Sequence, residues 1–293
     1  MSELRWHPLL EEWVVIAGHR QNRPQMPADW CPFCPGSGRV PEAYDVFLFP
    51  NDFPAFLRDS DSAYSACDVV LYSSDHTKLP SQLPLNQWQK IVDLWTSRTR
   101  ELIADARVKY VAVFENAGEA AGVTMPHPHG QIYALPFVPP RVEKETRAAA
   151  KSERSECLHC GILEKELAQA CRIIARNGSF VAFAPYFARF PYETCIYSAR
   201  HAPGLADLTS GESAGLAAMI LEMRQRYDAL FGFPMPLMMA LQQTGHFYVE
   251  FLPLQRSRDK LKYLASAESS LGIFLNDVPP ERAAAALRNL DLR

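Results

Sequence analysis

The segment Cys31-Pro-Phe-Cys34 recurs in the second half of the chain as Cys157-Leu-His-Cys160. Each cysteine pair is followed by two histidines, 42 and then 51 residues on in the first series, and 41 and then 45 residues on in the second. These histidines are His76 and His127 in the first series, and His201 and His246 in the second. A tyrosine, Tyr72 or Tyr197, precedes the first histidine of each series by four residues. So long a series of matches indicates an internal duplication.

The predicted secondary structure follows the same order in both halves. Apolar residues recur at helical spacing in residues 85–105 and 213–231, and short β-branched or apolar runs predict strands around them. The strands are expected at residues 45–50, 68–73 and 108–115, and again at 179–184, 194–198, 236–241 and 246–252. Residues 1–30 are expected to be extended or looped, and residues 141–156 to form a connecting helix or linker. We therefore predict two β-rich halves, residues 1–145 and 146–293, each with a helix over its part of the sheet.

Composition is ordinary for a soluble globular protein, with 48% hydrophobic and 22% charged residues. No apolar run reaches the ~18–20 residues of a membrane span, and the N-terminus does not resemble a secretory signal. With a net charge of −3 and no basic stripe, nucleic acid is not expected as the main partner. We expect a cytoplasmic protein, in which paired cysteines favour metal or redox chemistry over a disulfide framework.

Two cysteines and two distant histidines form a Cys2His2 set, which suits tetrahedral zinc. The first predicted site is Cys31, Cys34, His76 and His127, and the second is Cys157, Cys160, His201 and His246. In the second set, His159 could compete as a ligand. A redox dithiol is the alternative, but such a pair usually opens a helix after a strand, and neither pair here is expected to do so. Unrelated core residues are the other alternative.

The first series ends in His127-Pro-His129-Gly-Gln131. On a strand, residues two apart share one face, so two imidazoles and an amide would point the same way. If His127 binds metal, His129 is free, and a neutral imidazole is a competent nucleophile toward phosphorus. Gln131 could donate its amide N–H to a phosphate oxygen, and Gly130 would let the backbone approach the phosphate. The alternative is that both histidines are ligands or buried core residues.

Residues 114–131 resemble the active-site signature of the galactose-1-phosphate uridylyltransferases, a branch of the histidine-triad superfamily. The resemblance extends over almost the whole chain. It includes residues 20–24, 31–36, 51–53, 74–76, 185–194 and 256–268. The fold it implies is α+β, with two histidine-triad-like halves forming an antiparallel sheet flanked by helices.

The resemblance implies a ping-pong reaction through a uridylyl group on His129, with Gln131 holding the phosphoryl oxygens. It implies nucleotide-sugar and sugar 1-phosphate substrates, structural Zn²⁺, and a homodimer whose sites are completed across the interface. The substrate-binding residues it implies are Arg20, Arg23, Asn51, Asp52, Asn116, Gly122, Thr124, Gly130 and Lys262. Solvent exposure is the alternative for Lys262.

Some positions depart from this family. Glu145 and His246 match two positions of a second, often iron-binding site, but Gln242 and Tyr248 stand at the other two, so that site is expected to be absent. The second Cys2His2 set instead resembles the sister group that acts on ADP-glucose. An ADP-sugar adenylyltransferase or phosphorylase using the same histidine is therefore one alternative function. A non-catalytic, zinc-stabilised nucleotide-binding protein is another.

Overall fold

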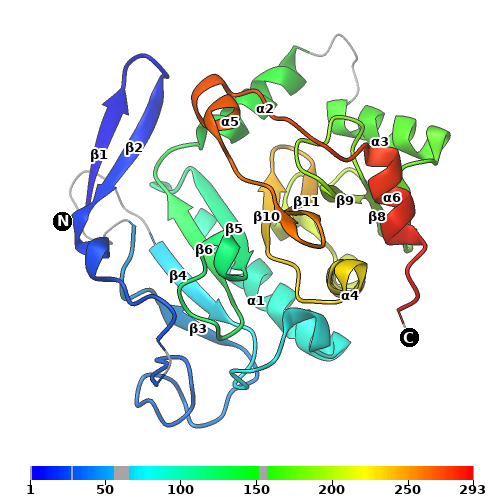
Figure 1. The fold of residues 1–293 in the computed structure, drawn as a ribbon. Helices are drawn as coiled ribbons and strands as arrows, with labels where there is room; N and C mark the ends of the chain where they lie inside the picture. Colours follow the sequence, from blue (N-terminus) through cyan, green and yellow to red (C-terminus); the bar gives the residue numbers. More distant parts are fainter. Residues whose placement is uncertain (1, 28, 56–65, 152–156, 293) are drawn as a thin grey trace.

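The computed structural model describes residues 2–27, 29–55, 66–151 and 157–292. Its main feature is a nine-stranded antiparallel sheet, ordered β3-β4-β6-β5-β10-β11-β9-β8-β7 (Figure 1). The first half contributes β3 (Phe47–Pro50), β4 (Ala66–Leu71), β5 (Tyr110–Ala117) and β6 (His129–Leu135). The second contributes β7 (Ile173–Arg176), β8 (Phe180–Phe183), β9 (Thr194–Ser198), β10 (Leu237–Gln243) and β11 (Phe247–Pro253).

The strand order confirms the duplication. The order β3-β4-β6-β5 in the first half is repeated as β8-β9-β11-β10 in the second, and the two halves meet where β5 pairs with β10. The sheet is therefore continuous across both halves. The expected boundary between residues 145 and 146 lies within α2 (Pro140–Ala150) and stays a prediction.

Two long helices cover one face of the sheet. Helix α1 (Leu85–Ile103) connects β4 to β5, α4 (Ser210–Phe231) connects β9 to β10, and the two pack against each other. A Thr209–Glu212 capping box starts α4, and Gly232 ends it in the left-handed region where glycine carries no steric cost. Large apolar side chains of both helices fill one core against the sheet, among them Trp88 and Trp95 of α1. Burial of these apolar side chains stabilises the two helices at the places where the apolar spacing predicts them.

The opposite face of the sheet is covered by less regular segments. A loop carrying Phe33 and Val40 packs over the first half, and α3 (Leu158–Gln169) packs Leu163 over the second. Cys157 is the N-cap of α3, so the second cysteine pair does open a helix, but not one that follows a strand, which was the redox arrangement not expected here. That pair follows α2 in element order rather than a strand, because residues 141–150 form a connecting helix, as expected. Residues 152–156 of the expected connection lie outside the described residues.

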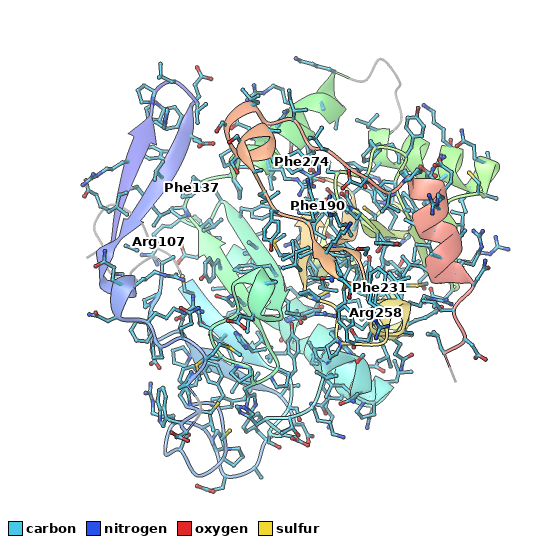
Figure 2. All side chains as sticks on the ribbon, viewed as in Figure 1. Arg107, Phe137, Phe190, Phe231, Arg258 and Phe274 are labelled. Atoms are coloured by element: carbon cyan, nitrogen blue, oxygen red, sulfur yellow. The ribbon has the colours of Figure 1, made fainter. Side chains whose placement is uncertain are left out.

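The chain termini add small elements. The first residues form a hairpin of β1 (Ser2–His7) and β2 (Glu12–Ala17), within the segment expected to be extended or looped. Near the C-terminus lie β12 (Gln255–Ser257), β13 (Lys260–Leu261), α5 (Ser266–Leu271) and α6 (Pro280–Arg288). Short 3-10 turns occupy Gly18–Asn22, Pro80–Gln82, Glu119–Ala121 and Leu205–Asp207. The segment after α5 is anchored where Phe274 packs on Phe190, with ring centroids 5.8 Å apart (Figure 2). In the described part of the chain, no helix combines the length and apolar composition needed to cross a membrane.

Candidate active site and metal centres

The first predicted ligand set converges in space. The ligand atoms of Cys31, Cys34, His76 and His127 all lie within 4.8 Å of one another. His127 is fully buried, and its Nε2 lies 2.7 Å from the carbonyl oxygen of Ser73. Because a carbonyl only accepts, Nε2 donates, and Nδ1 keeps its lone pair toward the two sulfurs, 3.8 and 3.7 Å away. This backbone partner orients the imidazole with Nδ1 toward the sulfurs, the arrangement that a metal-binding histidine needs.

The second set has matching geometry. Cys157, Cys160, His201 and His246 also lie within 4.8 Å of one another, and His246 Nε2 lies 3.1 Å from the carbonyl oxygen of Ser198. His159 is not part of this group, and it is buried rather than at the surface. Its Nδ1 lies 3.2 Å from the Tyr197 hydroxyl. Both Cys2His2 clusters could therefore hold a metal ion, since thiolates and imidazoles at this spacing suit a tetrahedral site.

His129 opens β6 and is 8% exposed. Its Nδ1 lies 2.7 Å from the His127 carbonyl oxygen and donates to it, which leaves the lone pair on Nε2. Burial lowers the pKa of His129, which favours the neutral ring. The backbone thus fixes both the tautomer and the orientation of a potential nucleophile.

Strand alternation places Gln131 on the same face as His129. The Tyr133 hydroxyl donates to Gln131 Oε1 over 3.0 Å. Since its oxygen is engaged, the Gln131 amide nitrogen is the group left to donate to a phosphate oxygen.

A cavity beside these two side chains is lined by four of the nine expected substrate-binding residues. His129 and Gln131 line it together with Arg23, Asn51, Asp52 and Thr124. Aromatic side chains complete its walls, namely Trp30, Phe33, Phe49 and Phe53. Cationic, amide and aromatic groups around one histidine suit a nucleotide, because they can contact phosphate, ribose and base.

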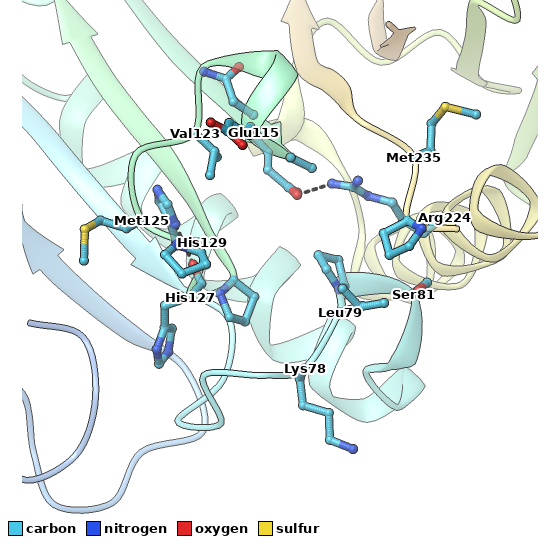
Figure 3. A pocket seen from close by; sticks show the side chains of 18 of the residues that line it. Lys78, Leu79, Ser81, Glu115, Val123, Met125, His127, His129, Arg224 and Met235 are labelled. Atoms are coloured by element: carbon cyan, nitrogen blue, oxygen red, sulfur yellow. Dashed lines mark hydrogen bonds and ion pairs between the residues drawn. The ribbon is translucent and has the colours of Figure 1, made fainter. Parts of the chain in front are cut away.

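A second cavity lies on the other side of the histidine motif, lined by His127, His129 and the expected residue Asn116 (Figure 3). Arg20 lies near Tyr133, where burial raises the tyrosine pKa and the arginine opposes that rise. Gly122 has a left-handed φ of 77° in the β5–β6 connection, and lines neither of these cavities. Lys262 lies elsewhere, in an ion pair with Glu268, so one chain does not bring it to His129.

Two sequence models of one family match the chain. The N-terminal domain of galactose-1-phosphate uridyl transferase matches residues 1–139, and its C-terminal domain matches residues 143–292. The chain belongs to the galactose-1-phosphate uridylyltransferase family. A member from Thermotoga maritima is 38% identical, with 100% of this chain and 99% of the relative covered. A member from Streptomyces lividans is 36% identical over 99% of this chain and 87% of the relative.

Solved structures agree with this membership. A uridylyltransferase structure superposes with a TM-score of 0.91 at 33% identity, and 98% of each chain is covered. An ADP-glucose phosphorylase from Arabidopsis thaliana, covering 99% of this chain and 100% of its own, has a TM-score of 0.79 at 24% identity, which shows a shared fold.

A network of side chains surrounds Glu145 and Tyr248, and the absence of an iron-type site here stays a prediction. By the repeat, Tyr248 and Glu250 stand in the second half where His129 and Gln131 stand in the first. The Tyr248 hydroxyl donates to the expected iron-site residue Glu145 over 2.9 Å. Glu250, which is 2% exposed, accepts from both terminal nitrogens of Arg141 at 2.6 and 2.7 Å. These contacts occupy the second half's counterpart of the active site.

Gly130 has a packing role on the face of β6 opposite His129. A Cβ at this position would lie 2.2 Å from the hydroxyl oxygen of Tyr72, which is fully buried. Contact of the Gly130 backbone with phosphate stays a prediction.

The paired tyrosines of the two series also differ, because Tyr72 packs in the core under α1 and α4, whereas Tyr197 packs in the cluster under α3.

Gly130→Ala is expected to lower the free energy of unfolding by at least ~1–3 kcal/mol, because the added methyl group overpacks the core against Tyr72. Chemical denaturation measures this change. Gly178→Ala is the matched control, since a Cβ there meets nothing within 4 Å. Tyr72→Phe in the Gly130→Ala background should recover part of the loss. Equal stability of Gly130→Ala and Gly178→Ala would contradict the packing role.

Proposed function

We propose that the chain is a UDP-hexose:hexose-1-phosphate uridylyltransferase that works through a covalent intermediate on His129. The observation that carries this proposal is the His129 ring, whose Nδ1 donates to a backbone carbonyl while Nε2 keeps its lone pair beside the cavity that Arg23 and Gln131 also line. Relatives named as galactose-1-phosphate uridylyltransferases, up to 38% identical over the whole chain, support uridine over adenine. A non-catalytic role would leave the retained His129–Gln131 pair without a purpose.

The proposed reaction has two displacements at phosphorus. His129 Nε2 attacks the α-phosphorus of UDP-glucose, the bond to the bridging oxygen breaks, and glucose 1-phosphate leaves. The phosphate oxygen of galactose 1-phosphate then attacks the same phosphorus, the P–N bond breaks, and UDP-galactose and free His129 result. The His127 carbonyl stabilises the positive ring of the intermediate through Nδ1–H. The Gln131 amide and the Arg23 guanidinium, which line the same cavity, stabilise charge on the transferred phosphoryl oxygens.

The direct test is exchange between UDP-glucose and galactose 1-phosphate. We expect UDP-galactose and glucose 1-phosphate to form with parallel-line, ping-pong kinetics. ADP-glucose in the same assay is expected to react far more slowly. A faster reaction with ADP-glucose would overturn the uridylyl assignment.

Both Cys2His2 clusters are proposed to hold structural zinc. The donors fit, since each set offers two sulfurs and two imidazole nitrogens, with one histidine held by a backbone carbonyl. When bound, the ion would join the 31–44 loop to the sheet in the first half and α3 to the sheet in the second, and its binding energy would add to folding.

The chain is also proposed to form a homodimer. The hairpin of β1 and β2 exposes Trp6 and Leu10, and the segment around α5 exposes Tyr263 and Leu271. Apolar side chains of this size mark interaction surfaces, and a partner chain could bring Lys262 to a second active site. Light scattering should give twice the 33.0 kDa chain mass. A monomer with full exchange activity would contradict this arrangement. The cytoplasmic location stays a prediction.

A further inference from the structure

A buried ion pair joins β5 to α4, on the face of the sheet that α1 and α4 cover. Glu115 of β5 and Arg224 of α4 are only 2% and 4% exposed, and their side chains are in contact (Figure 3). Arg224 comes from the second half of the chain, whereas Glu115 precedes Asn116 in the first. The two side chains line the same cavity as His129.

Tyr72 connects this ion pair to the histidine motif. A Cβ at position 130 would lie 2.2 Å from the Tyr72 hydroxyl oxygen and 3.2 Å from the carbonyl oxygen of Phe114, the residue before Glu115. Burial first, and then the Glu115 carboxylate, raise the pKa of the Tyr72 hydroxyl. That hydroxyl occupies the space that a side chain at position 130 would need. The backbone N–H of Tyr72 donates to the Pro128 carbonyl over 3.0 Å. Tyr72 therefore touches both residues that flank His129.

The second half of the chain provides an internal comparison. The strand register that places Glu115 opposite Gly130 places Leu241 opposite Val249 beneath Tyr248. Leu241 and Val249 are buried apolar core residues. The same fold is thus built without a buried charge at this place in the half that lacks the catalytic histidine.

A buried ion pair adds little net stability compared with apolar residues of similar volume. Its presence at this place in the first half, where the second half has apolar residues, therefore calls for a reason other than folding. We infer that Arg224, acting through Glu115 and Tyr72, is a positioning residue that fixes residues 128–130 so that His129 Nε2 faces the α-phosphorus. The inference rests on the proposed uridylyl transfer. Catalytic side chains need such support, because small displacements of a nucleophile cost large factors in rate.

The test compares Arg224→Met with Arg226→Met, a control on the same helix. Arg226 bonds Glu222 and backbone carbonyls near α6, away from the active site. Arg224→Met is expected to lower kcat for exchange by at least about 10-fold, with KM for UDP-glucose within about threefold. The single-turnover rate of His129 uridylylation should fall by the same factor. Arg224→Lys should retain more of kcat than Arg224→Met, whereas Arg226→Met should leave kcat unchanged.

A second variant separates positioning from folding. Arg224→Met leaves the Glu115 carboxylate buried and unpaired, so the double variant Arg224→Met/Glu115→Leu removes that penalty. We expect its Tm to return close to the wild-type value while kcat stays low. The inference would be overturned if the double variant recovered kcat together with Tm. It would also be overturned if Arg224→Met kept the wild-type kcat, or if Arg226→Met lost as much kcat as Arg224→Met. Failure of the wild-type protein to accept label from UDP-glucose would instead reject the proposed function.

Discussion

His129→Ala is expected to lower the exchange rate by on the order of 10⁶-fold, as when other enzymes lose their covalent nucleophile. In the described structure, His129 is the one histidine that lines the cavity with Arg23 and Gln131, and its Nε2 keeps the lone pair, whereas His127 is turned toward its cysteines. Nucleotide binding should be retained, because the other residues of the cavity are unchanged. Isotope exchange and calorimetric binding of UDP-glucose measure the two properties separately.

His129→Asn is the matched control for this prediction. Its amide can still donate to the His127 carbonyl, the contact that His129 Nδ1 makes, but it has no nucleophilic nitrogen. We expect the asparagine variant to be as inactive as the alanine variant, with the metal content of the wild-type protein. Turnover by either variant at more than a trace of the wild-type rate would reject the covalent mechanism.

Cys34→Ser is expected to reduce the zinc content from two ions to one per chain and to lower Tm by more than about 10 °C. Cys34 Sγ lies 3.3 Å from His76 Nδ1 and 3.7 Å from His127 Nδ1. The substitution therefore removes a sulfur donor from between the two histidines of the first cluster. Structural zinc in small domains contributes ~10–16 kcal/mol, and ~1 kcal/mol corresponds to about 2–4 °C in a protein of this size. Elemental analysis and calorimetry measure both quantities.

The first cluster also supports the cavity beside His129 and Gln131, whose walls include Trp30 and Phe33 from the cysteine loop. Cys34→Ser should therefore raise KM for UDP-glucose as well. Cys171→Ser is the control, because Cys171 is exposed and belongs to neither cluster. Cys160→Ser should lose the other zinc ion and retain most of the activity. Two zinc ions in Cys34→Ser would contradict the assignment of the first site.

The sequence predicted the repeated elements well because each half has a strong local signal. Helix α1 begins at the expected residue and ends at Ile103, two residues early, and β9 has the expected bounds. The pairing of β5 with β10 could not be predicted from the repeat, since neither strand carries a feature that selects a partner from the other half. Residues 1–30 were expected to be extended or looped, and the pairing of residues 2–17 into a hairpin was not predicted.

Four of the nine expected substrate-binding residues lie at the cavity beside His129, and their binding of substrate stays a prediction. Arg23, Asn51, Asp52 and Thr124 meet at one cavity, as expected. The Glu115–Arg224 pair was missed because its members lie 109 residues apart in the sequence, in separate halves. Only the strand register, which puts Glu115 on the helix face, brings them together.

The measurement that tests the central claim most directly is transfer of label from UDP-glucose labelled at the α-phosphorus to the protein, followed by peptide mapping. We predict about one acid-labile, base-stable uridylyl group per chain, located on His129 and released as UDP-galactose when galactose 1-phosphate is added. Label on another residue, or no label on folded, metal-loaded protein that still exchanges hexoses, would contradict the covalent mechanism.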